Sequence, residues 1–142
     1  MKLLPIAALL ASLLTTTLAA AQAPSDALYE SLGARPGIHN IVGGMLRGVL
    51  ADGRIKDVFN GVDMVKLAKL LEQQFCIVAG GPCKYEGRDM QDAHEGMKVT
   101  NAEFNALVEN LQGAMDQQGV ASAVQNKLLA RLAPMQKMIV TN

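Results

Sequence analysis

The 142-residue chain is predicted to form one all-α domain. Over most of its length apolar residues recur at intervals of three and four, which places them on one face of an α-helix. No segment shows the sustained alternation of apolar and polar residues that a half-buried strand requires. Glycines, prolines and capping residues separate the periodic runs, and there are no internal repeats. The fold class expected from these observations is therefore all-α.

The first 21 residues are interpreted as a secretory signal peptide that precedes the domain. Lys2 is followed by an apolar run from Leu3 to Leu14 and by small residues that end at Ala21. We expect cleavage after Ala21, since a cut two residues later would leave Pro24 beside the scissile bond. The alternative is a membrane anchor, but the apolar run is shorter than the roughly 20 residues of a spanning helix. We expect an exported, periplasmic protein with a signal peptide at 1–21 and one domain at 22–142.

The first half of the domain contains two long predicted helices. An apolar stripe from Ile38 to Leu50 indicates the first, which ends at Gly53. A short helical turn at 55–59 follows. Asp63 is placed to cap the second helix, whose apolar face runs from Met64 to Val78 and ends at a Gly-Gly-Pro sequence.

The second half begins with a segment rich in glycine. Residues 80–99 are expected to be mostly loop, with a brief helix around His94. Thr100 followed by Glu103 is a capping-box pattern, and it opens a helix that carries apolar residues as far as Met115. A last helix bears the apolar positions between Val124 and Ile139 and is expected to bend at Pro134.

The composition bears on partners and on the core. With Lys2 removed, 12 basic residues face 13 acidic ones, so there is no basic field that would attract nucleic acid. The chain has no Trp, three Phe and two Tyr, against eight Met. A core that is poor in rings and rich in flexible Met is suited to packing around a large guest, although Met-rich helical cores without a guest are commoner.

The two cysteines, Cys76 and Cys83, are close in sequence. In an exported protein such a pair is more often a disulfide than a metal site, and zinc would need further ligands that are not clustered nearby. A disulfide across so short a loop would stabilise the fold by roughly 2.5 kcal/mol.

The residue inventory excludes several kinds of site. There is no Gly-rich phosphate loop followed by Lys, the serines lie in no strand–turn–helix elbow, and the carboxylates are scattered. Haem iron needs only one protein histidine, because the porphyrin supplies the other nitrogens. His94 is the candidate, with Met90 one helical turn before it and Gly96 able to end that turn. From the residues alone, a surface histidine remains the commoner interpretation.

Five motifs occur in a fixed order along the chain, and together they resemble the truncated haemoglobins of the first group. Those small globins have a two-over-two helical sandwich, and the similarity runs from about Ala27 to Thr141. Each motif is weak alone, but their order and spacing are specific. The motifs are ALYESLG (27–33), VLADGRI (49–55), VFNGVDM (58–64), GGPCKYEGRDMQDAHEGM (80–97) and VTNAEFNALVENL (99–111).

The resemblance implies one haem b, with His94 as the proximal iron ligand and Phe59 packed on the haem face. For the remaining matched positions, plain core packing is the alternative to haem contact. The same match assigns to the haem environment Tyr85, Met90, Val99, Phe104 and Val108.

The chain departs from the family on the side where the ligand binds. Many members have a Tyr on the first long helix and a Gln on the next, whereas the matching positions here are Leu46 and Leu71, with Leu67 beside them. A hydrogen-bond donor stabilises bound O₂, so an apolar distal side predicts weaker O₂ binding relative to CO. It also predicts faster autoxidation. One branch of the group has a similar sequence around the GGPCKYEGRDM motif together with a pair of cysteines, and this chain resembles that branch.

Gln74 is the one polar residue on the stripe that carries Leu67 and Leu71. Our hypothesis is that its amide serves as the remaining distal donor. The alternative is that Gln74 lies beyond the haem edge and bonds to a backbone group.

The function implied is reversible binding of a diatomic gas (O₂, CO or NO), in the oxygen-binding or oxygen-transport class, with an unidentified reductase as partner. Neither nucleic acid binding nor membrane insertion is expected, and a monomer is compatible with the sequence. The alternatives are a haem redox enzyme (nitric oxide oxidation or peroxide reduction), an electron carrier, and a haem-free helical binding module. An electron carrier would need a second axial ligand, for which the candidates are Met45 and His39. Candidate partners for the haem propionates are Lys69, Lys84 and Arg88.

Overall fold

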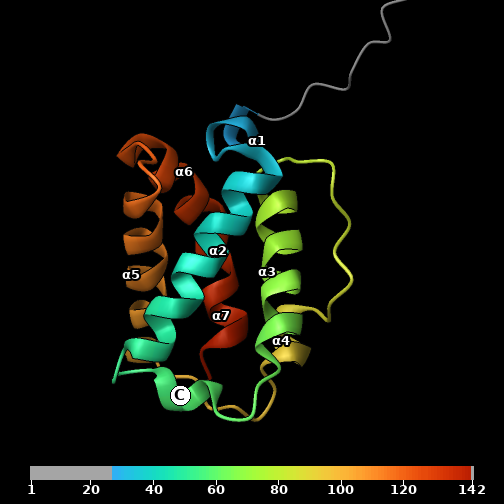
Figure 1. Ribbon diagram of the computed structural model, residues 1–142. Helices are drawn as coiled ribbons and strands as arrows, with labels where there is room; N and C mark the ends of the chain where they lie inside the picture. The colour runs from blue at the N-terminus through green and yellow to red at the C-terminus, as the bar shows by residue number, and fades with distance from the viewer. Residues whose placement is uncertain (1–26, 142) are drawn as a thin grey trace, which may run out of the picture.

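The computed structural model describes residues 27–141 and consists of helices joined by loops (Figure 1). The predicted signal peptide lies outside these residues. None of the described helices is long and apolar enough to cross a membrane. The elements are α1 (Ala27–Ser31), α2 (Ala34–Ala51), η1 (Lys56–Phe59), α3 (Met64–Val78), α4 (Met90–Ala93), α5 (Asn101–Gln117), α6 (Ser122–Leu132), η2 (Ala133–Met135) and α7 (Gln136–Ile139).

The long helices form two antiparallel pairs. Helix α2 lies between α5 and α3 and makes its most extensive contacts with these two (Figure 1). Helix α3 runs back along α2, and α6 with α7 runs back along α5. Further contacts join α3 to α6 and α5 to α6. This arrangement confirms the all-α prediction and the expected two-over-two layering.

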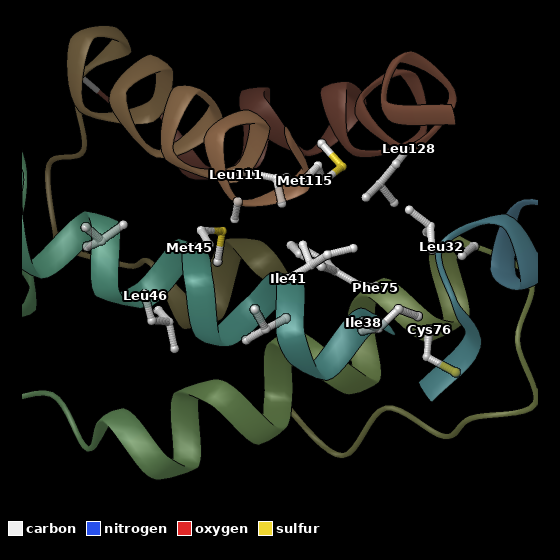
Figure 2. Close-up of a cluster of buried hydrophobic side chains, with 14 of the residues drawn as sticks. Leu32, Ile38, Ile41, Met45, Leu46, Phe75, Cys76, Leu111, Met115 and Leu128 are labelled. Atoms are coloured by element: carbon white, nitrogen blue, oxygen red, sulfur yellow. The ribbon is translucent and has the colours of Figure 1, made fainter. Parts of the chain in front are cut away.

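The main core lies where α2 meets α5. Met45 of α2 and Met115 of α5 are at most 1% exposed and lie among aliphatic side chains from α2, α5 and α6 (Figure 2). Phe75 and Tyr29 are the buried rings of the described chain. Flexible Met side chains therefore fill volume that aromatic residues fill in most small domains. The buried residues labelled with them in Figure 2 are Leu32, Ile38, Ile41, Leu46, Cys76, Leu111 and Leu128.

A glycine and a polar network set the spacing of α2 and α5. A Cβ atom added to Gly48 would lie 2.4 Å from Oδ1 of Asn110. Asn110 is held in place because its amide donates to Oδ2 of Asp52 at 2.9 Å. Asp52 also pairs with Arg54 at 2.8 Å, and Arg54 reaches Glu109 of α5. The hydrogen bonds from Arg54 hold the pKa of the Asp52 carboxyl well below its usual range. The network thus fixes the end of α2 against α5.

The predicted helix ends agree with the structure at both capped starts. Oδ1 of Asp63 accepts from the backbone N–H of Lys66 at 3.0 Å. Thr100 and Glu103 form both halves of a capping box. The last helix is divided at Pro134 into α6, the 3₁₀ turn η2 and α7. The backbone stays in the right-handed helical region on both sides of the proline, so the chain remains helical through this turn, where Pro134 has no N–H to donate.

A disulfide joins Cys76, near the end of α3, to Cys83 in the following loop, as the sequence analysis expected. Gly81 lies against it: a Cβ atom there would come within 2.7 Å of Sγ of Cys76 and within 2.4 Å of the Tyr29 ring. From this point residues 79–89 run along the outer side of α3 as far as α4 (Figure 1). The disulfide thus anchors the start of the loop that leads to His94.

Removing the disulfide is expected to lower the free energy of unfolding by roughly 2.5 kcal/mol, because the unfolded chain regains the freedom of the closed loop. The variant that tests this carries both Cys76→Ala and Cys83→Ala, and urea unfolding with and without a thiol reductant is the measurement. Reductant should destabilise the wild-type protein and leave the double variant unchanged. Equal midpoints for oxidised and reduced wild type would contradict the prediction.

Candidate functional site

His94 lies at the end of α4, in a polar turn that defines the orientation of its ring. Asp89 caps this helix by accepting from the backbone N–H of Asp92 at 2.9 Å. Gly96, with a φ of +74°, turns the chain away two residues after His94, as predicted. The His94 side chain is partly buried. The helix therefore presents the imidazole at a sharp turn of the chain.

One hydrogen bond places a proton on Nδ1 of His94. Its Nδ1 atom lies 2.8 Å from the carbonyl oxygen of Met90. A carbonyl only accepts, so Nδ1 carries the proton and donates. In a neutral ring this tautomer leaves on Nε2 the lone pair that a metal ligand needs. Within residues 27–141 no cluster of three or more His, Cys, Asp or Glu side chains could hold a bare metal ion.

Gln74 of α3 extends its amide toward the same short helix. The amide nitrogen donates to Sδ of Met90 at 3.2 Å and to Sδ of Met135, in η2, at 3.6 Å. These partners are thioether sulfurs, not the backbone group of the alternative proposed above. From the sequence, Met135 is predicted only as part of the apolar face of the last helix, and nothing in the periodicity indicates its contact with Gln74.

The remaining apolar candidates lie on η1, α2, α3 and α5. Leu46 is 7% exposed and lies on the side of α2 that faces α3 (Figure 2). The others are only half-buried, although they are apolar. Half-exposed apolar side chains on η1, α3 and α5, each of which contacts α2, offer a surface for an apolar ligand. They are Phe59, Leu67, Leu71, Phe104 and Val108.

Val99 and Tyr85 also have partners within the protein. Val99 is buried, forms a parallel bridge with Val140, and accepts from the N–H of Thr141 at 3.1 Å. This contact holds residues 140–141 against Val99, which follows the His94 turn in the sequence. The Tyr85 hydroxyl donates to the Arg88 carbonyl at 2.9 Å, and burial raises the pKa of Tyr85. Tyr85 therefore helps to fold its own loop.

The charged candidates are on the surface. Lys69 already pairs with Glu86 at 3.0 Å, and Lys84 and Arg88 are exposed. Of the two candidate axial ligands, His39 has a 70% exposed side chain that contacts Glu72 at 2.8 Å. The other, Met45, lies in the core between α2 and α5.

Two surface hollows lie away from His94. One, of about 160 Å³, lies between α2 and α5 and is lined by Gly48 and Arg54. The other, of about 370 Å³, lies between α2, α3 and the disulfide and is lined by His39 and Lys69. Neither is lined by the half-buried apolar residues named above.

The sequence profile of the family described as bacterial-like globin matches residues 27–141, which is the whole described part of the chain. The chain is a bacterial-like globin. This globin is 35% identical over 97 residues to a group 1 truncated hemoglobin of Tetrahymena thermophila, across 68% of this chain and 80% of that protein. It is 30% identical to the group 1 truncated hemoglobin GlbN of Nostoc commune over 112 residues, which cover 79% and 95% of the two chains.

Solved structures give the same result. The Fe(III) form of the Tetrahymena pyriformis truncated hemoglobin superposes with a TM-score of 0.78 at 32% identity, over 81% of this chain and 98% of that one. The 2/2 hemoglobin of Synechococcus gives a TM-score of 0.75 at 25% identity, over 81% and 98%. The truncated-globin fold predicted from the motifs is therefore confirmed, and the cofactor of this globin is haem iron. The imidazole of His94, whose Nδ1 lies 2.8 Å from the Met90 carbonyl, and the half-buried apolar side chains of η1, α3 and α5 fit that cofactor.

Proposed function

We propose that this globin holds the iron of one haem b through Nε2 of His94 and reversibly binds a diatomic gas, in the oxygen-binding or oxygen-transport class. The observation that carries the proposal is the hydrogen bond from Nδ1 of His94 to the Met90 carbonyl. It selects the tautomer with a free Nε2, and such a bond raises the basicity of a ligating imidazole. When bound, haem would supply an iron at which O₂, CO or NO can bind.

The distal side supports gas binding over redox catalysis. Leu46 and Leu71 match positions where many related globins have a Tyr and a Gln, and Leu67 lies beside them. None of the three can donate or transfer a proton. Peroxide reduction depends on a side chain that moves protons. We therefore favour reversible binding, with O₂ held less tightly relative to CO. A reductase that keeps the iron ferrous is the partner that this role requires.

Absorption spectra of the haem-reconstituted protein test the proposal. We expect the ferrous form to have one protein ligand and to bind CO at the open position. A ferrous spectrum with two axial protein ligands, before any gas is added, would contradict the proposal and favour an electron carrier. Failure to take up haem would favour the haem-free binding module.

Introducing a distal donor with Leu71→Gln is expected to slow O₂ dissociation by about tenfold. The reason is that one new hydrogen bond to bound O₂ contributes about 1.4 kcal/mol in a dry pocket. Stopped-flow measurement of O₂ and CO dissociation checks this, and the CO rate should change far less. The matched control is Leu50→Gln, because Leu50 is half exposed on α2. Equal O₂ dissociation from the wild type and the Leu71 variant would place residue 71 away from the ligand.

We also propose that the protein is exported to the periplasm and cleaved after Ala21. The support is the order of a basic residue, an apolar run and small residues at 1–21. Mass spectrometry of the protein from fractionated cells tests this, and we expect a mature chain that starts at Gln22. An uncleaved chain in the cytoplasm would overturn the proposal.

A further inference from the structure

We propose that Gln74 is a positioning residue for His94, acting through Met90, whose sulfur accepts from Gln74 and whose carbonyl accepts from His94. This inference rests on the proposed ligation of iron by His94. It differs from the distal-donor hypothesis, in which the Gln74 amide would contact the bound gas.

Met90 connects the two side chains. Its Sδ atom lies 3.2 Å from the Gln74 amide nitrogen, and its carbonyl oxygen lies 2.8 Å from Nδ1 of His94. The Gln74 amide also reaches Sδ of Met135, in η2, at 3.6 Å. One amide of α3 thus contacts both α4 and the segment that follows Pro134.

Helix α4 needs external support. It has only four residues, Met90–Ala93, and so short a helix is not stable in isolation. The capping contact from Asp89 holds its N-terminus on the loop side. On the interior side, contacts from Gln74 and from α7 hold it. The position of the Met90 carbonyl therefore depends on contacts made outside α4.

The chemistry of the contact explains why an amide is suited to it. Methionine is flexible and adopts many side-chain conformations unless a neighbour selects one. A thioether sulfur accepts hydrogen bonds, although weakly. The donor amide of Gln74 therefore gives the Met90 side chain a preferred orientation. The carbonyl that receives the Nδ1 proton in turn controls ring orientation and basicity in a ligating histidine. Loss of the amide should therefore change the bond between His94 and iron without any change in the residues that face the gas.

The neighbouring Gln73 supplies a matched control. Its amide donates to Oε2 of Glu86 at 3.0 Å, and its carbonyl oxygen accepts from the Glu86 N–H at 3.1 Å. Gln73 therefore has the same residue type on the same helix, but it holds the outer loop instead of α4. Gln→Met at either position keeps an unbranched chain of similar length and removes the N–H donor.

The experiment compares wild type, Gln74→Met, Met90→Leu and Gln73→Met, each reconstituted with haem. Resonance Raman spectroscopy of the ferrous form gives the iron–histidine stretching frequency, and infrared spectroscopy of the CO form gives the C–O stretch. Nitrogen NMR of the haem-free protein gives the His94 tautomer. We expect Gln74→Met and Met90→Leu to lower the iron–histidine stretching frequency and the population of the Nδ1–H tautomer of His94. Both variants should also lose haem faster, by up to about tenfold. Gln73→Met should match wild type, and the C–O stretch should not move.

Two outcomes would overturn the inference. An unchanged iron–histidine frequency and His94 tautomer in both Gln74→Met and Met90→Leu would show that Gln74 does not position the histidine. A shifted C–O stretch with an unchanged iron–histidine frequency would assign Gln74 to the gas instead. Failure of the proposed function is a separate result, in which the iron–histidine stretch is still present in His94→Ala. In that case the NMR measurement would still report whether Gln74 orients His94.

Discussion

Replacement of His94 by alanine is expected to remove the proposed protein bond to iron and so to weaken haem binding severely. Losing a hydrogen-bond partner of a metal-ligating histidine typically costs about 10- to 100-fold in affinity, and losing the ligand itself should cost more. What remains is contact between the porphyrin and half-buried apolar side chains. The ferrous variant should lack a histidine–iron bond, and added imidazole should restore one.

Two measurements check this expectation: the absorption spectrum of each oxidation state, and the rate at which haem transfers to an excess of a haem-scavenging apoprotein. The matched control is His39→Ala, since His39 is the other histidine of the chain and contacts Glu72 on the surface. That control should retain the wild-type spectrum and transfer rate. A His94→Ala protein with unchanged iron coordination would remove the basis of the proposed site.

The largest effect on stability is expected from Gly37→Ala, at about 3 kcal/mol of lost unfolding free energy. A Cβ atom on Gly37 would lie 1.9 Å from the carbonyl oxygen of Leu32 and 2.8 Å from its carbonyl carbon. Both are backbone atoms of the tight turn between α1 and α2, where Gly33 has a φ of +83°. Because backbone cannot rotate aside as a side chain can, the start of α2 would have to move.

Urea unfolding of Gly37→Ala and Gly53→Ala, compared with wild type, tests this prediction. Gly53 is a suitable control because a Cβ atom there would meet nothing within 4 Å. The Gly53 variant should be close to neutral. A Gly37 variant as stable as the Gly53 variant would mean that the turn from α1 into α2 is looser than the structure describes.

Local sequence signals predicted most of the fold. Asp63 and Thr100 mark helix starts because a capping side chain and its backbone partner are only three residues apart. The cysteine pair and the turn at Gly96 are short-range features of the same kind. The five family-like motifs together had an order and spacing specific enough to predict the fold of the whole domain.

Contacts between distant segments could not be predicted in this way. The hydrogen bond from Gln74 to Met135 depends on the path of the chain around Pro134. A proline predicts where a regular α-helix is interrupted, but it does not predict the direction of the segment that follows. The bridge between Val99 and Val140 joins two isolated residues with no strand pattern around them. Sequence periodicity placed Gln74 on the stripe of Leu67 and Leu71 without identifying its partners Met90 and Met135.

The pairing of Val99 with Val140 has a consequence for how the protein is made. The histidine turn is synthesised well before the segment that is later fastened beside it. A nascent chain that has reached only α6 still lacks Met135 for Gln74 and Val140 for Val99. The contacts of Met135 and Val140 can therefore form only after residues 135–141 are translated, and we expect stable capture of haem at the proposed His94 site to follow chain synthesis.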